Sequence, residues 1–140
     1  MSAKKFLLFT ICLICCLACS KENLVDTSST FTLIGKWGME SGTITDKDGS
    51  TRRYENLGKG TYYQYLEYKV DGTLIKTTLP DGQKTYGVYT YNDASRELSY
   101  KYDGDLYYYP ASINILSGKE MIITTDYGSL GRITQHMVKQ

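Results

Sequence analysis

The stretch TYGVYTYNDASRELSYKYDGD, residues 85–105, alternates apolar and polar side chains between turn signals. In its second half Leu98, Tyr100 and Tyr102 fall on one face of an extended chain, opposite polar neighbours. Alternation with a period of two is typical of a β-strand that has one buried face. The NDAS and DG segments suit tight turns, because Gly takes positive φ freely and Asn and Asp tolerate it. The stretch therefore predicts two antiparallel strands joined by a short turn.

The same pattern continues along the chain on both sides of this stretch. Turn signals such as DKDGS, PDG, SG and YGSLG recur every 8 to 12 residues or so, which is typical of an all-β sandwich or barrel. The expected strands are 33–45, 60–70, 73–79, 83–91, 96–102, 105–115, 119–126 and 131–139, with a further short strand within 51–57. Consecutive strands with short loops either close on themselves or leave two open edges. We expect an all-β fold, an up-and-down antiparallel β-barrel of about eight strands.

Tyrosine is unusually frequent, with 14 tyrosines against 3 phenylalanines. One interpretation is that Tyr is simply a good strand former whose hydroxyl reaches water from a half-buried position. The other is a cavity that is apolar at the ring faces and hydrogen-bonding at the hydroxyls. The alternation places seven candidates on the face of such a cavity: Tyr68, Tyr89, Tyr91, Tyr100, Tyr102, Tyr107 and Tyr109.

The N-terminus predicts export and a lipid anchor. The basic start MSAKK is followed by a 13-residue apolar run, residues 6–18, and then by Cys19. A basic start, a short apolar run and a small residue are the layout of a secretory signal, and the run is shorter than the roughly 20 residues that span a bilayer. Leu-Ala-Cys at its end fits a bacterial lipobox, which predicts that Cys19 carries the lipid. A signal cleaved without lipidation and an uncleaved signal-anchor remain the alternatives.

These boundaries divide the chain into three parts. Residues 1–18 are the expected signal peptide, 19–30 a polar lipidated tether, and 31–140 one β-barrel domain. The expected location is the cell envelope, attached to the outer membrane through the N-terminal lipid. The SKEN segment after Cys19 partly resembles a surface-export signal, so both periplasm-facing and surface-facing placement stay open.

Charge and motif content argue against several functions. The chain has 16 basic and 15 acidic side chains and no basic run, which disfavours nucleic acid as a partner. Three of the four cysteines lie in the apolar run, Cys19 directly follows it and His136 is the only histidine, so no metal-ligand set is expected. No nucleophile-elbow motif or phosphate loop is present, and we expect neither an enzyme nor a cofactor.

Several motifs together resemble the lipocalin-like lipoproteins of Bacteroides-type bacteria. The motif GKW, residues 35–37, is similar to the Gly-x-Trp that opens lipocalin barrels, and YKVDGTLIKTT, the 85–105 stretch and SGKEMIITTDYG are similar to the repeats of these lipoproteins. The resemblance covers about residues 33–138. It implies a lipocalin-like barrel in which Arg132 stacks on Trp37 at the closed end.

The leading functional hypothesis is a lipid-anchored binding module that takes a small apolar or amphipathic ligand in a Tyr-rich barrel. An alternative is a filled barrel that acts as a protein-interaction or envelope-assembly subunit, with exposed tyrosines such as Tyr63 and Tyr65 as its contact surface. A third is a glycan-binding accessory lipoprotein. The identity of a protein partner is not predicted.

Overall fold

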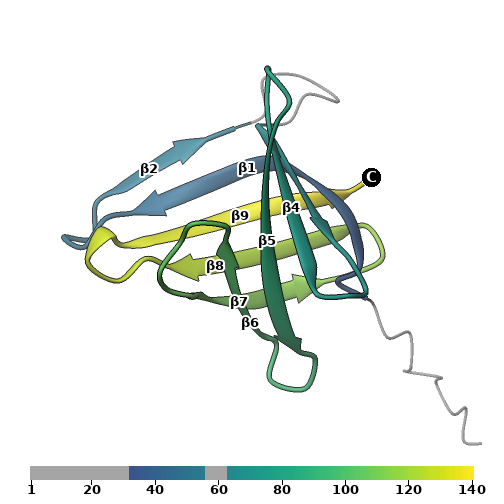
Figure 1. Cartoon of the computed structure of the whole chain (residues 1–140). Helices are drawn as coiled ribbons and strands as arrows, with labels where there is room; N and C mark the ends of the chain where they lie inside the picture. Colours follow the sequence, from purple (N-terminus) through teal and green to yellow (C-terminus); the bar gives the residue numbers. More distant parts are fainter. Residues whose placement is uncertain (1–31, 56–62) are drawn as a thin grey trace, which may run out of the picture. The chain divides into compact units, whose positions relative to one another are not determined.

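An antiparallel sheet that closes on itself forms the described part of the chain (Figure 1). The computed structural model describes residues 32–55 and 63–140. Its elements are β1 (Gly35–Thr45), β2 (Thr51–Tyr54), β3 (Gln64–Tyr68), β4 (Thr73–Thr78), β5 (Gln83–Asn92), β6 (Glu97–Tyr102), β7 (Tyr109–Leu116), β8 (Glu120–Asp126), the 3-10 turn η1 (Gly128–Leu130) and β9 (Arg132–Lys139). The expected all-β barrel of about eight strands is confirmed. The expected signal peptide and tether, including Cys19, lie outside the described residues.

Pairing between the first and last strands closes the barrel. β9 runs between β8 and β1, as Figure 1 shows, and its register with β1 extends from Trp37–Lys139 to Thr45–Arg132. The other edge of β1 is shared: residues 35–38 pair with β3, whereas residues 42–45 pair with β2. Eight strands therefore make the closed barrel, and β2 is an additional ninth strand on the sheet.

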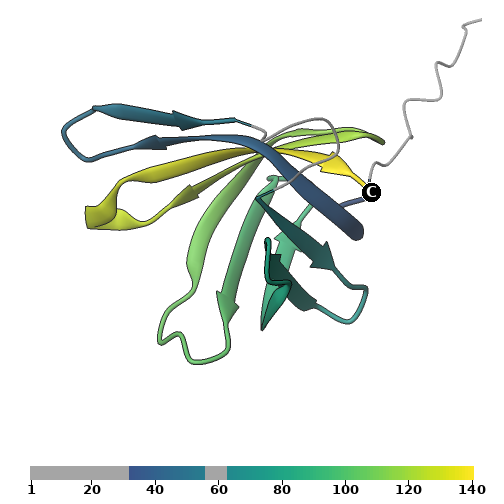
Figure 2. The same cartoon turned by 90° about the horizontal axis from the view of Figure 1, so that it is seen from above.

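The two ends of the barrel differ, and each is named here after a residue. The Trp37 end is where β1 begins and β9 ends. The Tyr127 end is where β1 ends and β9 begins, and it carries the turns 46–50, 79–82, 103–108 and 127–131. Figures 1 and 2 show the β1–β2 and β8–β9 hairpins extending in the same direction at this end.

The core lies at the Trp37 end. Trp37, Leu74, Met121 and Met137 come from four different strands and are fully shielded from solvent. Trp37 also donates a hydrogen bond from its indole Nε1 to the carbonyl oxygen of Leu33, at 2.8 Å. Apolar side chains alternate along each strand, and their burial makes the face that carries them the inner face of the barrel.

One strand begins well after its predicted boundary, while most other strand boundaries differ by no more than two residues. The expected strand 105–115 begins only at Tyr109, and residues 103–108 form a loop. Asp105 explains the difference locally, because its Oδ2 accepts a hydrogen bond from the backbone N–H of Tyr102 at 3.0 Å and closes a turn. Tyr107 therefore lies outside the strand with 78% of its surface exposed, and its expected place on the interior face is wrong.

The expected stack of Arg132 on Trp37 is also wrong. β1 and β9 are antiparallel, so Trp37 near the start of β1 lies opposite Lys139 at the end of β9, and the Lys139 Nζ is 5.1 Å from the Trp37 ring. Arg132 lies opposite Thr45 at the other end, where its Nε is 3.7 Å from Asp126 Oδ2. The cation over the tryptophan is thus supplied by a different residue of the same strand.

Within the described residues no helix is long and apolar enough to cross a membrane.

Candidate functional site

On β3, β4 and β9 the inward-facing side chains become more exposed from the Trp37 end towards the Tyr127 end. On β4 Leu74 is fully buried, while Lys76, two residues further along the same face, is half-buried. On β3 Leu66 is buried and Gln64 is half-buried, and on β9 Met137 is buried and Gln135 half-buried. We call the partly accessible interior at the Tyr127 end the cup; the inward side chains that form it include Gln64, Lys76, Tyr102, Tyr109, Tyr127 and Gln135.

Phenol rings make up most of the cup wall. Tyr109 packs on Tyr100 at a centroid distance of 5.6 Å and on Tyr127 at 5.1 Å. Tyr100 also meets Tyr102 edge to face at 5.6 Å. Tyr100 and Tyr102 of β6 and Tyr109 of β7 are therefore joined in one cluster with Tyr127 of the β8–β9 loop, which lies further along the chain.

Hydroxyl groups of these rings form a small buried network. The Tyr100 hydroxyl lies 3.2 Å from Thr125 Oγ1 and 3.1 Å from the Tyr127 hydroxyl. Thr125 is the buried polar residue of the barrel core, and this contact satisfies its hydroxyl. The network holds Tyr127, which follows the last residue of β8, in the barrel interior.

Desolvation sets the protonation state of this cluster. Burial raises the pKa values of Tyr68, Tyr100, Tyr102 and Tyr127 above their usual value near 10, because a phenolate there would lose its hydration. Neighbouring phenols raise the pKa values of Tyr68, Tyr102 and Tyr127 further, whereas the hydrogen bonds of Tyr100 to Thr125 and Tyr127 act to lower its pKa. A phenol is neutral at physiological pH even at its usual pKa, so burial only extends the protonated state of these four hydroxyls to higher pH.

The Tyr68 hydroxyl stands apart from this network. Tyr68 is 1% exposed, meets Tyr89 edge to face at 5.0 Å, and its hydroxyl has no hydrogen-bond partner among the described residues. A buried hydroxyl without a partner costs about 1–3 kcal/mol. Such a group in a native structure therefore needs a physical explanation.

Lys76 places a positive charge inside the cup. It lies opposite the buried Leu66 in the β3–β4 register, so its side chain points into the barrel. Its Nζ lies 4.3 Å from the centre of the Tyr102 ring, a cation–π contact. Within the described part of the chain no carboxylate oxygen lies within 4.0 Å of this ammonium group.

The structure brings most of the predicted tyrosines together. Tyr68 and Tyr100 are core residues, and Tyr89, Tyr91, Tyr102 and Tyr109 pack against the core while staying partly exposed. Tyr107 is the exception, as described above. Of the tyrosines expected on an exposed contact surface, Tyr63 packs against the core and meets Tyr54 edge to face at 5.3 Å, and Tyr65 is half-buried beneath Lys36, whose Nζ is 4.2 Å from the ring.

Sequence reasoning missed several residues that form or adjoin the cup, among them Gln64, Gln135, Lys76 and Tyr127. Lys76 falls two residues after Leu74 on the same face, but a charged side chain is normally expected to face solvent. Tyr127 was assigned to a loop, yet it keeps the alternation of Ile123 and Thr125. Tyr54 comes from β2, the extra strand, and its ring lies over Gly42, where a Cβ atom would overlap it.

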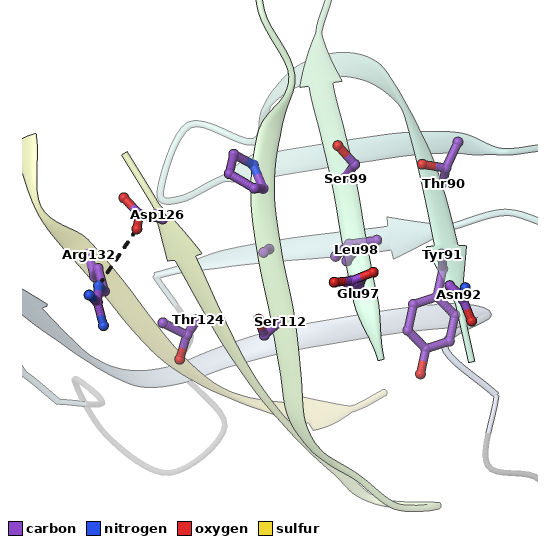
Figure 3. A pocket seen from close by; sticks show the side chains of 12 residues that line it. Thr90, Tyr91, Asn92, Glu97, Leu98, Ser99, Ser112, Thr124, Asp126 and Arg132 are labelled. Atoms are coloured by element: carbon purple, nitrogen blue, oxygen red, sulfur yellow. Dashed lines mark ion pairs between the residues drawn. The ribbon is translucent and has the colours of Figure 1, made fainter. Parts of the chain in front are cut away.

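A separate hollow lies on the outer face of the barrel. Its volume is about 660 Å³, and Figure 3 shows Arg132 and Asp126 at one side, Tyr91 and Asn92 at the other, and Ser112 and Thr124 between them. Ser112 alternates with the inward residues Ala111 and Ile113, which places it outside. A second outer hollow of about 730 Å³ adjoins this one, shares Ser112, Thr124, Asp126 and Arg132 with it, and continues to the β1–β2 turn at Asp46 and Lys47.

A metal-ligand cluster is not formed by the described residues. No group of three or more His, Cys, Asp or Glu side chains there could hold a metal ion. The chain matches no protein-family model, no curated protein and no solved structure.

Proposed function

We propose that this chain is a lipid-anchored binding module of the cell envelope, similar to the lipocalin-like lipoproteins, and not an enzyme. Its site is the cup, which takes a small amphipathic ligand. The apolar faces of Tyr102, Tyr109 and Tyr127 would contact the ligand, and their hydroxyls would orient it.

The observation that carries this proposal is the change of exposure along the barrel. A barrel that served only as a scaffold would be expected to bury its inward residues at both ends, because an accessible interior forgoes packing energy. Here the inward residues of β3, β4 and β9 are buried at the Trp37 end and half-buried at the Tyr127 end. A packed floor beneath an accessible upper interior is the arrangement of a one-ended binding site.

Small molecules that copurify with the chain test the proposed site. Native mass spectrometry of the protein taken from its own host is expected to show a bound species that Tyr109→Ala and Tyr127→Ala release. Tyr86→Ala, on a half-exposed ring of β5, serves as the matched control and should retain it. A wild-type protein that carries no small molecule and binds no amphipathic probe in titration would contradict the proposal.

The proposed anchor has its own test, because it rests on the N-terminal sequence alone. Metabolic labelling with an acyl-chain analogue should label the wild-type chain and place it in the membrane fraction. Cys19→Ala is expected to abolish both, whereas Cys16→Ala should abolish neither. Persistent labelling of Cys19→Ala would show that the lipid, if present, is attached elsewhere.

A second candidate function is saccharide binding in the outer hollow. Its volume of about 660 Å³ falls within the range of ligand pockets, roughly 300–1,000 Å³. Its lining combines small hydroxyls with the Asp126–Arg132 pair and the Tyr91 ring, the groups that bind and stack on sugars. Ser112→Trp would fill this hollow without touching the cup, so loss of oligosaccharide binding in that variant alone would favour this second function.

A further inference from the structure

Two polar groups lie on the inner face of β3 and β4, one in the core next to the cup and one in the cup itself. The Tyr68 hydroxyl is buried without a partner, and the Lys76 ammonium faces inwards with no carboxylate within 4.0 Å in the described part of the chain. We propose that the cup recognises an amphipathic monocarboxylate, whose carboxylate binds the Lys76 ammonium and accepts a hydrogen bond from the Tyr68 hydroxyl. This inference rests on the proposed function, since it names the ligand chemistry of the same cup.

The register of β3 and β4 brings the two groups together. Tyr68 pairs with Leu74 and Leu66 pairs with Lys76, so Tyr68 and Lys76 are diagonal neighbours on the inner face. Diagonal neighbours of this kind lie about 7–8 Å apart, within reach of long side chains. Both also adjoin Tyr102, since Lys76 lies over its ring and its phenol is the strongest electrostatic neighbour of Tyr68.

The chemistry of the pair favours an anion. Lys76 supplies a positive charge, and the Tyr68 phenol is protonated at neutral pH, so it can donate to a carboxylate oxygen. Hydrogen bonds between charged partners are roughly twice as strong as those between neutral ones. An alcohol would form no ion pair with Lys76, and the Lys76 ammonium would repel a ligand that carries its own ammonium group.

One acidic side chain near the proposed site should repel a bound anion. Asp105, in the loop 103–108, accepts a hydrogen bond from the Tyr102 backbone and raises the pKa of Tyr102 by charge repulsion. Its negative charge should weaken carboxylate binding. This makes Asp105 a second, independent position at which the proposal predicts the sign of an effect.

The apolar part of the ligand would extend towards the loops of the Tyr127 end. Leu106 and Leu130 lie in these loops and are 85% and 76% exposed. With the carboxylate at Lys76, the tail of a monocarboxylate would run past Tyr109 and Tyr127 towards these side chains. Covering such exposed apolar surface with a tail is favourable.

Titration calorimetry with three probes of equal chain length tests the proposal: octanoate, 1-octanol and octylammonium. The protein is residues 20–140, because residues 31–140 form one compact unit that holds the core of the described barrel. Octanoate should bind at least about tenfold more tightly than 1-octanol, and octylammonium should bind most weakly.

Variants then assign the carboxylate to its partners. Lys76→Gln should weaken the binding of octanoate about tenfold and leave the binding of 1-octanol unchanged. Lys84→Gln, at an exposed lysine on β5, should change neither affinity. Asp105→Asn should increase the affinity for octanoate, because it removes a nearby negative charge. Tyr68→Phe should weaken octanoate about fivefold and yet keep or raise the Tm of the ligand-free protein, because it removes an unpartnered hydroxyl.

The outcomes separate this inference from the proposed function. If 1-octanol binds as tightly as octanoate, shifts the backbone resonances of the cup and is insensitive to Lys76→Gln, the cup is a binding site but the carboxylate assignment is wrong. Tighter binding of octylammonium would overturn the inference in the same way. If none of the three probes binds, the inference and the proposed amphipathic ligand fail together.

Discussion

At Gly87 the barrel leaves no room for a side chain. This inward-facing glycine on β5 lies against β6, where an added Cβ would overlap the Lys101 carbonyl oxygen and lie 2.9 Å from the Tyr102 Cα. Both are backbone atoms and cannot rotate away.

We therefore expect Gly87→Ala to lower the free energy of unfolding by about 2 kcal/mol or more. Gly82→Ala is the control. Its φ of 68° disfavours alanine, but no atom lies within 4 Å of the new Cβ. The free energy of unfolding should therefore fall by only about 1 kcal/mol. Urea unfolding measures both. Equal losses would mean that strand spacing at Gly87 adjusts freely.

Two buried tyrosines should respond oppositely to loss of their hydroxyls. Tyr100→Phe removes the partner of Thr125 and of the Tyr127 hydroxyl, and should destabilise the barrel by about 1–2 kcal/mol. Tyr68→Phe removes a hydroxyl with no partner and should leave the free energy of unfolding unchanged or raise it. Equal destabilisation by both variants would show that Tyr68 has a structural partner.

At the scale of the strands, the pairing of β1 with β9 decides which cation covers Trp37. Lys139→Ala should cost about 0.5–1 kcal/mol and shift the Trp37 fluorescence, because it removes the ammonium 5.1 Å from the ring. Arg132→Ala removes an exposed ion pair at the opposite end and should cost about 0.5 kcal/mol or less without a spectral change. A spectral shift in Arg132→Ala instead would contradict the observed register.

At the scale of the whole barrel, the buried phenols make stability depend on alkaline pH. Tyr68 and Tyr102 keep their protons in the folded state above their usual pKa near 10, while the unfolded chain releases them there. The unfolded state then binds fewer protons, so the free energy of unfolding is fully retained below about pH 10 and falls above it. The fall is about 1.4 kcal/mol per pH unit for each such group.

Urea unfolding between about pH 8 and about pH 11 measures this dependence. The double variant Tyr68→Phe with Tyr102→Phe should lose less stability over the same range. A wild-type curve that stays flat above pH 10 would show that the phenols ionise without unfolding.

Much of the barrel could be predicted because strand alternation is local. Leu98, Tyr100 and Tyr102 were assigned to the inner face from their spacing alone, and they lie there. The error at Tyr107 came from extending alternation through a segment that an Asp105 side-chain hydrogen bond turns into a loop. The expected Arg132–Trp37 contact was wrong because the resemblance to lipocalins implied an arginine of the last strand without specifying its position. The antiparallel register of β1 and β9 alone determines which residue lies opposite Trp37.

The sequence by itself determined the strands, their inner faces and the predominance of tyrosine in the interior, because a two-residue period and turn chemistry act between neighbours in the chain. Only the tertiary structure decided which end of the barrel is packed and which is accessible, that Lys76 and Tyr68 are neighbours on the inner face, and that the Tyr68 hydroxyl has no partner among the described residues. These features depend on registers between strands that meet across the closed sheet. Such registers are set by packing of the whole barrel, so the recognition chemistry proposed here emerges only when the sheet closes.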